Sequence, residues 1–183
     1  MLNIKKGQLL ISEPSLSDPT FFKSVALLIH HSKNESIGLI LNQPTKINLN
    51  QILEDIPMGD FPVYIGGPVE RNSIHFIHTL GDIIPNTKEI SKGISWGGDF
   101  NRIVSLMKEK RISRKQIRFF AGYCGWSEGQ LHSEVREDSW IIHRPNITKC
   151  MQYSNEKLWS DLIKKEHSKY AIWTNMPKDP SLN

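Results

Sequence analysis

The stretch Ile117–Trp140 constrains the fold of this chain more than any other, because its composition changes from strand-like to turn-like to helical. Its first part, Ile117–Tyr123, is short, apolar and rich in aromatic residues, which is typical of a strand buried on both faces. Gly122 and Gly125 come next, and glycine tolerates backbone angles that a Cβ atom penalises. The sequence therefore predicts a buried strand that ends in a tight glycine turn.

A short helix is expected directly after this turn. Ser127 and Gln130 have the spacing of a capping box, in which the serine oxygen accepts a backbone N–H of the first turn and the glutamine reaches back to the cap. Leu131 and Val135 lie four positions apart and form the apolar side of this helix. The segment Trp140–His143 is then expected to return as a strand.

The remaining strands are expected as short apolar segments between turn residues. Two of them, Ser24–His31 and Ile37–Asn42, are joined by a polar link that is short enough for a hairpin, so we expect them to pair antiparallel. Gly66 and Gly67 follow another strand and allow the backbone to approach a neighbouring segment closely. The other expected strands are Gln8–Ser12, Pro62–Ile65 and Ser73–Thr79.

Helices are expected where a capping residue precedes apolar residues at helical spacing. Asp18-Pro19 predicts a single turn at Thr20–Phe22, and Asp99 predicts the start of a longer helix that ends at Lys108–Arg111. Because short strands come in clusters between isolated helices, the chain is expected to be α+β rather than a doubly wound sheet. Further helices are expected from Asn48 through Ile56 and from Asn155 onward, with Gly81–Lys92 rich in loops.

The size and composition of the chain favour one globular domain. With 183 residues it is long enough for a substantial core, and two full domains would be cramped. The formal net charge of +4 permits an acidic partner without requiring one. No apolar run reaches membrane-spanning length, and Cys124 and Cys150 show no metal-binding spacing. We therefore expect a cytoplasmic protein with reduced thiols, no membrane association and an extended tail at residues 177–183.

Several motifs, in order along the chain, are similar to those of the AlgH/YqgE-type bacterial proteins. Glu134 and Trp140 also fall where that family has a helix carboxylate and the tryptophan of the next strand. The resemblance covers nearly the whole chain. The motifs that carry it are GQLLI at Gly7–Ile11, DPTF at Asp18–Phe21, IGLILNQP at Ile37–Pro44, PVYIGGPV at Pro62–Val69 and GYCGWSEGQL at Gly122–Leu131.

The resemblance implies a single α+β domain over residues 1–183, in which a mixed, mainly antiparallel sheet curls into a partial barrel flanked by helices. For function it implies a transcriptional regulator or a protein without an agreed reaction or ligand. It implies no cofactor.

A different interpretation of the central stretch is a small serine hydrolase. Gly125–Gly129 matches the nucleophile-elbow pattern G-x-S-x-G and lies between a strand and a helix, as that pattern requires. Asp161 and His167 follow in the hydrolase order, after Ser127. However, Ser127 already has a sufficient role as a helix cap, so a structural serine is favoured and Ser127 is kept as the alternative nucleophile.

Cys124 is expected between a strand end and a helix N-terminus, where the helix dipole and free N–H groups favour a thiolate. The same N–H groups suit an anion such as a phosphate or carboxylate. The competing interpretation is a small residue in a tight turn. The histidine pairs His30/His31 and His75/His78 are expected to point to opposite faces of their strands, so no metal site is predicted from either pair.

Basic residues cluster around the loop after the helix that Asp99 begins. Gathered in space they would engage phosphates, as a nucleic-acid-binding regulator does. No helix-turn-helix, zinc-finger or ribonucleoprotein motif accompanies them, so solvated charge is favoured over nucleic-acid binding. The residues are Lys108, Lys110, Arg111, Arg114, Lys115 and Arg118.

The leading prediction is a non-enzymatic binding or regulatory protein with an unidentified protein partner or small ligand. Its binding residues come from three segments that each end a strand or begin a helix, where aromatic side chains beside fixed amides make good anchors. The predicted binding residues are Asn42, Gly66, Gly67, Tyr123, Gly125, Trp126, Gln130 and Glu134.

Overall fold

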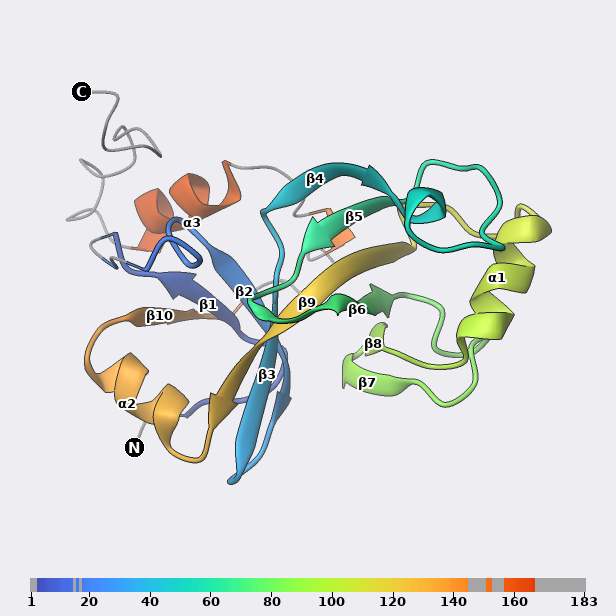
Figure 1. Ribbon diagram of the computed structural model, residues 1–183. Helices are drawn as coiled ribbons and strands as arrows, with labels where there is room; N and C mark the ends of the chain where they lie inside the picture. The colour runs from blue at the N-terminus through green and yellow to red at the C-terminus, as the bar shows by residue number, and fades with distance from the viewer. Residues whose placement is uncertain (1–2, 15, 17, 145–150, 153–156, 167–183) are drawn as a thin grey trace.

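The computed structural model describes residues 3–14, 16, 18–144, 151–152 and 157–166 (Figure 1). Its strands are β1 Leu9–Ser12, β2 Val25–His31, β3 Glu35–Ile40, β4 Pro44–Asn48, β5 Pro62–Ile65, β6 Val69–His78, β7 Lys88–Ser91, β8 Ile94–Trp96, β9 Ile117–Ser127 and β10 Trp140–His143. Its helices are the 3₁₀ turn η1 Leu49–Gln51 and the α-helices α1 Phe100–Lys108, α2 Gln130–Arg136 and α3 Leu158–Glu166.

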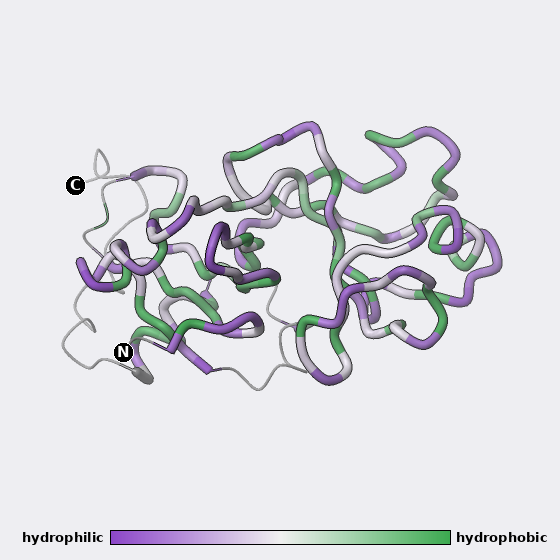
Figure 2. The backbone as a smooth tube through the Cα atoms, turned by 90° about the horizontal axis from the view of Figure 1, so that it is seen from below, coloured by the Kyte–Doolittle hydropathy of each residue, from purple (hydrophilic) through white to green (hydrophobic). Residues whose placement is uncertain are grey.

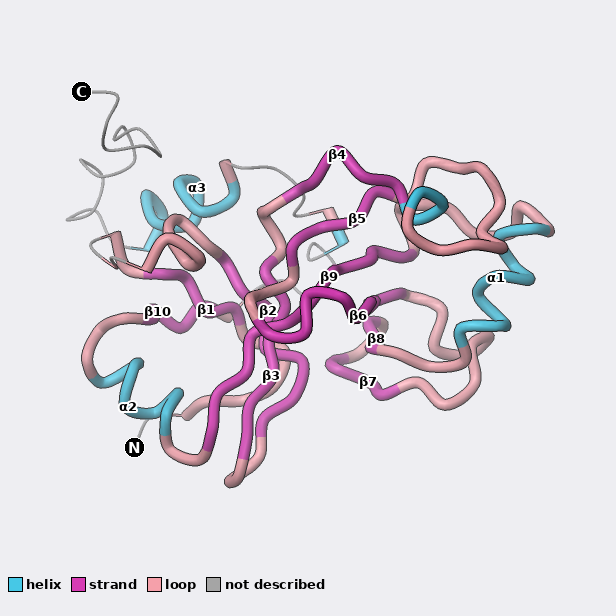
Figure 3. The backbone as a smooth tube through the Cα atoms, viewed as in Figure 1, coloured by secondary structure: helices cyan, strands magenta, loops and turns pink. Residues whose placement is uncertain are grey.

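The ten strands form one sheet in the order β10-β1-β2-β3-β9-β6-β8-β7, to which β5 and β4 are added through β9. Every strand pairing is antiparallel except the parallel pairing of β5 with β9. The sheet curls without closing, and the helices lie at its periphery (Figures 1 and 3). The predicted α+β class, with a curled and mainly antiparallel sheet, is confirmed.

Strand β9 joins the two halves of the sheet and runs through the middle of the molecule (Figure 1). Its first half pairs with β5 and β6, so that Phe119 lies opposite Val63 on one side and Phe76 on the other. Its second half pairs with β3, where Cys124 lies opposite Gly38. Successive side chains of its first half enter different buried clusters, Phe119 one and Phe120 another, and a strand buried on both faces has to be apolar, which explains the composition of this part of the chain.

Buried side chains form separate clusters on the two faces of the curled sheet. The cluster around Phe120 includes Trp159 of α3, whose Nε1 donates to the Ser12 carbonyl oxygen at 2.8 Å and so fixes α3 on β1. The cluster around Phe119 receives the buried face of α1. Figure 2 shows hydrophobic stretches along the packed strands and hydrophilic ones at the outer loops and turns.

Several predicted elements are present. The hairpin of β2 and β3 is antiparallel, and Asp99 caps α1 by accepting the Arg102 backbone N–H at 3.2 Å. The residues after Asp18 form a turn in which the Asp18 carboxylate accepts the Thr20 N–H at 2.8 Å. Asn155 and the predicted tail at 177–183 lie outside the described residues.

The expected end of the central strand at Tyr123 is wrong, because β9 continues to Ser127. Hydrogen bonding to β3 extends the strand, with Glu35 opposite Ser127 at the far end. Gly122 has a φ of +69° inside the strand, and the turn into α2 is made instead by Gly129, at φ +73°. Ser127 is therefore not the helix cap, although the Gln130 side chain does accept its backbone N–H at 3.0 Å.

The expected helix from Asn48 to Ile56 is also wrong beyond its first turn. The Asn48/Gln51 capping box is present, but it begins only the 3₁₀ turn η1. Asp55 adopts a left-handed φ of +59°, which a helix cannot contain. Strands β4 and β8 have no counterpart among the predicted strands, and β7 overlaps the segment Gly81–Lys92 that the sequence predicts to be rich in loops.

Within the residues that the structure describes, no helix combines the length and hydropathy needed to cross a membrane.

Candidate functional site

The predicted residues of α2 and β9 meet in a hydrogen-bonded network around one carboxylate. Glu134 Oε2 accepts the indole N–H of Trp126 at 2.8 Å and that of Trp140 at 2.7 Å. Its other oxygen accepts from Gln130 Nε2 at 2.9 Å. The two indoles pack edge to face with their centroids 5.9 Å apart. This network fastens α2 to β9 and β10.

Trp126 belongs to the core rather than to the surface. Its side chain is only 4% exposed, and its ring lies on Gly38, where an added Cβ would approach it to 3.0 Å. A buried tryptophan with its N–H paired has no free face to offer a partner. Of the predicted binding residues in this segment, Gly125 and Gln130 are the exposed ones.

Cys124 does not have the environment of a reactive thiol. Burial raises its pKa, with a further contribution from the Glu134 carboxylate, so the thiol stays protonated. Its Sγ donates to the Gly66 carbonyl oxygen at 3.4 Å. Of the two interpretations of Cys124, the thiolate at a helix N-terminus is wrong, because the strand continues past Cys124 and places it in the apolar cluster with Trp126.

Gly66 and Gly67 are brought against β9, as the sequence predicts. A Cβ on Gly66 would lie 2.2 Å from the Gly122 oxygen, and one on Gly67 would lie 2.1 Å from the Tyr123 carbonyl carbon. Asn42 has a different role: its Oδ1 accepts the Val25 N–H at 2.9 Å and its Nδ2 donates to the Lys23 oxygen at 2.8 Å. Buried and bonded to the backbone on both sides, Asn42 closes the end of the β2–β3 pair.

Tyr123 lies apart from the tryptophan network, on the side of β9 that faces β6. Its ring contacts His75 edge to face, with centroids 5.3 Å apart, and His75 in turn lies 6.3 Å from Trp96. A cavity of about 250 Å³ beside this aromatic row is lined by Ile74, His75, Phe76, Asn86, Lys88, Trp96, Gly97 and Gly98. The predicted binding residues are thus divided between the backbone contact at Gly67, the network at Glu134 and this aromatic row.

Ser127 lacks the surroundings of a catalytic serine. Its hydroxyl donates to Gln130 Oε1 at 3.2 Å, and among the described residues no histidine is bonded to it. Asp161 lies on α3, which packs on β1, and His167 lies outside the described residues. Nothing in this arrangement supports a nucleophile with its base.

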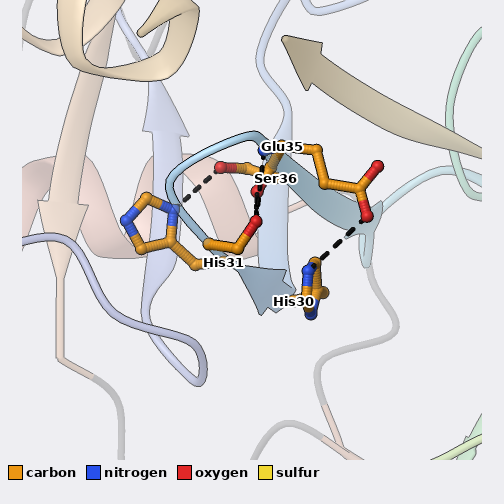
Figure 4. A network of polar contacts seen from close by, with 5 residues as sticks. His30, His31, Glu35 and Ser36 are labelled. Carbon is orange, nitrogen blue, oxygen red and sulfur yellow. Dashed lines mark hydrogen bonds and ion pairs between the residues drawn. The ribbon is translucent and has the colours of Figure 1, made fainter. Parts of the chain in front are cut away.

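The tip of the β2–β3 hairpin carries a histidine-rich polar network, drawn in Figure 4. His31 Nδ1 lies 2.8 Å from the Ser36 hydroxyl, and His30 Nε2 lies 3.6 Å from Glu35 Oε1. His132 of α2 lies against His31, with ring centroids 5.5 Å apart. Burial lowers the pKa of His31, and the neighbouring His132 and His30 lower it further. In the part of the chain that the structure describes, no group of three or more His, Cys, Asp or Glu side chains is arranged to hold a metal.

The predicted basic cluster does not form one patch. Arg111 pairs with Glu109 at 3.1 Å and Arg114 pairs with Asp60 at 2.6 Å. Arg118 is buried at 4% exposure, and its Nη2 donates to the Leu41 oxygen at 2.7 Å. Lys108, Lys110 and Lys115 remain exposed.

A larger cavity, not expected from the sequence, lies at the start of β9. Its volume is about 490 Å³. The guanidinium of Arg118 forms part of its wall and lies over the Tyr64 ring at 4.3 Å and the Phe120 ring at 5.3 Å. We call this space the Arg118 cavity. It is lined by Pro62, Tyr64, Thr79, Arg114, Lys115, Ile117, Arg118, Met151 and Gln152.

One sequence signal could have pointed to this cavity. Arg118 is the charged residue inside the apolar run Ile117–Tyr123, and a charge in a buried strand requires partners or a function. The other wall residues come from β5, from the residue after β6, from the loop before β9 and from Met151 and Gln152, which carry no common pattern. Their convergence depends on the parallel pairing of β5 with β9.

Comparisons with known proteins agree with this architecture. A family model described as AlgH-like matches residues 9–171. A UPF0301 protein from Bacteroides fragilis is 38% identical over 179 residues, which are 97% of this chain and 91% of that protein. UPF0301 proteins from Chlorobaculum tepidum and Cytophaga hutchinsonii are 34% and 35% identical, over 98% of this chain and 96% and 100% of their own lengths.

Two solved structures share the fold. The solution structure of the AlgH protein from Pseudomonas aeruginosa has a TM-score of 0.74 at 22% identity, over 97% of this chain and 98% of that one. A crystal structure of a protein from Corynebacterium diphtheriae has a TM-score of 0.76 at 19% identity, over 96% of this chain and 94% of that one.

Proposed function

This chain belongs to the AlgH-like family, and from that premise we propose that it is a non-enzymatic binding protein that holds a small anionic ligand in the Arg118 cavity. The observation that carries the proposal is a cavity of about 490 Å³ whose wall contains a guanidinium that lies over two aromatic rings. This volume falls in the range of small-molecule sites, about 300–1,000 Å³.

The charge of the wall selects an anion. Arg114, Lys115 and Arg118 line the cavity, and no acidic side chain is among the described residues that do so. Arg114 is already paired with Asp60, so Lys115 at the rim and Arg118 in the wall supply the main positive field. The guanidinium is held in place by the Leu41 carbonyl and the rings of Tyr64 and Phe120, so it loses little conformational freedom on binding.

The rest of the wall favours a ligand with an apolar body. Tyr64, Ile117 and Met151 present hydrophobic surface, while Thr79 and Gln152 offer hydrogen-bonding groups. An organic carboxylate or phosphate satisfies both parts of the wall, since its head group meets the cations and its body lies on the apolar side chains.

The lining favours binding over a covalent reaction that uses a hydroxyl nucleophile. Among the described lining residues Thr79 carries the one hydroxyl nucleophile besides the Tyr64 phenol, and no histidine or carboxylate lines the cavity to activate either. Against the alternative of a hydrolase at Ser127, we expect a fluorophosphonate probe to leave the protein unlabelled. Labelling that disappears in Ser127→Ala would overturn the non-enzymatic proposal.

A second proposal is that the predicted surface from Tyr123 to Glu134, with Asn42 and the Gly66-Gly67 turn, binds a regulatory protein partner. Its exposed members, Gly125 near the end of β9 and Gln130 at the start of α2, lie away from Arg118, which is at the start of β9. A cytoplasmic location likewise stays a prediction from the sequence.

Binding is tested with benzoate, with acetate as the probe that lacks the apolar body, and with inorganic phosphate. Calorimetry on the full chain should show benzoate binding more tightly than acetate. In ¹H–¹⁵N spectra the signals of Thr79, Ile117 and Arg118 should shift. Lys115→Glu should weaken benzoate binding by about tenfold, because it reverses a charge at the rim.

Lys108→Glu is the matched control, because it makes the same charge change on an exposed lysine that does not line the cavity. It should leave the affinity unchanged. Equal losses in Lys108→Glu and Lys115→Glu would show that only the overall charge of the protein matters. Absence of any shift at Thr79 and Arg118 with all three probes would refute the proposed function.

A further inference from the structure

Two histidines from different elements lie side by side at the end of the molecule opposite the Arg118 cavity along β9. His31 is near the end of β2 and His132 is on α2. Their ring centroids are 5.5 Å apart and their planes are inclined by 35°. Both side chains are only partly buried, so solvent reaches the pair.

We propose that His31 and His132 bind a divalent transition-metal ion such as Zn²⁺, Ni²⁺ or Cu²⁺. A metal that binds one nitrogen of each ring at about 2.0–2.1 Å, with an angle near tetrahedral, brings the two ring centroids to roughly 5 Å apart. The observed separation of 5.5 Å is therefore close to that of a bridged pair.

Ser36 leaves His31 with one ring nitrogen available for a metal. Ser36 is 4% exposed, and its hydroxyl lies 2.8 Å from His31 Nδ1 (Figure 4). With Nδ1 engaged, Nε2 is the ligand atom. Metal-binding histidines usually have their second nitrogen hydrogen-bonded in this way, because the bond fixes both the tautomer and the ring orientation.

Neutral imidazole is the form that binds a metal. The neighbouring His30 lies against Glu35 instead, with Nε2 3.6 Å from Glu35 Oε1, so it serves as an internal control.

The donor set limits which ions fit. Two imidazoles suit Zn²⁺, Cu²⁺ and Ni²⁺, whereas Mg²⁺ requires oxygen ligands. Because no third His, Cys, Asp or Glu among the described residues completes the site, water fills the remaining positions. The affinity should be highest for Cu²⁺, intermediate for Ni²⁺ and Zn²⁺, and lowest for Mn²⁺.

A bound ion would connect α2 to the β2–β3 hairpin. These elements already share an apolar cluster, in which Leu131 of α2 is grouped with Leu28 of β2, so the ion would add a polar link at the surface. Binding to the folded state alone raises the melting temperature by mass action. The site thus predicts stabilisation by transition metals and none by Mg²⁺.

The test uses the untagged full chain with NiCl₂, ZnCl₂ and MgCl₂, because an affinity tag would add histidines. Calorimetry should give one bound Ni²⁺ or Zn²⁺ per chain, a rise in melting temperature and no response to Mg²⁺. Zinc should also shift the imidazole C–H signals of His31 and His132 in NMR spectra.

His132→Ala should lower the affinity for Ni²⁺ at least tenfold, and His132→Gln should do the same while retaining a polar side chain. His30→Ala is the matched control, because it removes the adjacent histidine and should change the affinity by less than twofold. Retention of full affinity in His132→Gln, or an equal loss in His30→Ala, would overturn the proposal.

Discussion

At the scale of single residues, the glycines that constrain this fold are those that another backbone approaches. A Cβ on Gly67 would lie 2.1 Å from the Tyr123 carbonyl carbon, and backbone atoms cannot move aside without breaking the β9 pairing. Gly125 differs, because the nearest atom to its Cβ would be the Tyr123 ring at 3.3 Å, which can rotate. The same amino acid type therefore has different roles at positions that the sequence treats alike.

We expect Gly67→Ala to reduce the free energy of unfolding by about 3 kcal/mol or more, because overpacking against the backbone forces the two strands apart. Gly125→Ala should change it by less than about 1 kcal/mol, since its contact is with a side chain. Urea unfolding followed by circular dichroism measures both. Equal losses in the two variants would show that the close approach at Gly67 is not present in solution.

As a surface anchor, the role that the sequence predicts, Trp126 could be replaced by alanine with loss of partner binding and little loss of stability, but the structure indicates the opposite. Trp126 is 4% exposed and donates its N–H to Glu134, so its truncation leaves a cavity and a carboxylate that has lost a donor. We expect Trp126→Ala to cost about 3–5 kcal/mol of unfolding free energy. A melting temperature close to that of the unmodified protein would restore Trp126 as a surface residue.

At the scale of elements, the two short helices that the sequence predicts through caps begin differently. Asp99 accepts the Arg102 N–H at the start of α1, whereas α2 begins after Gly129 and has no side-chain cap. The reason lies in β3, which holds the chain extended as far as Ser127. Strand pairing thus decides where α2 can start.

Asp99→Ala should therefore destabilise the protein by about 1 kcal/mol, the usual effect of losing an N-cap. Ser127→Ala should change the free energy of unfolding by less than about 0.5 kcal/mol, because the Ser127 backbone N–H still donates to Gln130. Thermal and urea denaturation distinguish the two. A loss in Ser127→Ala as large as that in Asp99→Ala would show that the serine does cap α2.

At the scale of the whole molecule, buried histidines make the stability dependent on pH. His78 is fully buried, with Nε2 2.9 Å from the Gly97 oxygen and Nδ1 accepting the Leu80 N–H at 3.1 Å. Burial lowers its pKa, although the hydrogen bond to Gly97 acts in the opposite direction. The pKa of His75 is also lowered by burial, against the effect of Glu70.

Because these pKa values lie below the unfolded value of about 6.5, the unfolded chain takes up protons first as the pH falls. The free energy of unfolding should therefore decrease as the pH falls below about 6.5 and stay nearly level above about 7.5. Urea titrations between about pH 5 and pH 8 measure this slope. His78→Gln should reduce it, and an unchanged slope in that variant would assign the pH dependence to other groups.

The sequence by itself determined the class of the fold, because strand and helix periodicity and capping residues are local. The antiparallel hairpin, α1 with its Asp99 cap, the Gly66-Gly67 approach and the strand at Trp140–His143 all follow from patterns within a few residues. The curled shape of the sheet was predicted by the resemblance to the AlgH/YqgE-type proteins and not by local patterns.

Only the tertiary structure decided what each polar or aromatic residue does, because burial depends on segments far apart in the chain. Hydrogen bonding to β3 lengthened β9 and made Cys124 and Trp126 part of the core. The parallel pairing of β5 with β9 brought Tyr64 to Arg118 and formed a cavity that no local pattern marks. Periodicity reports which face of an element is apolar, whereas partners and cavities depend on which faces meet.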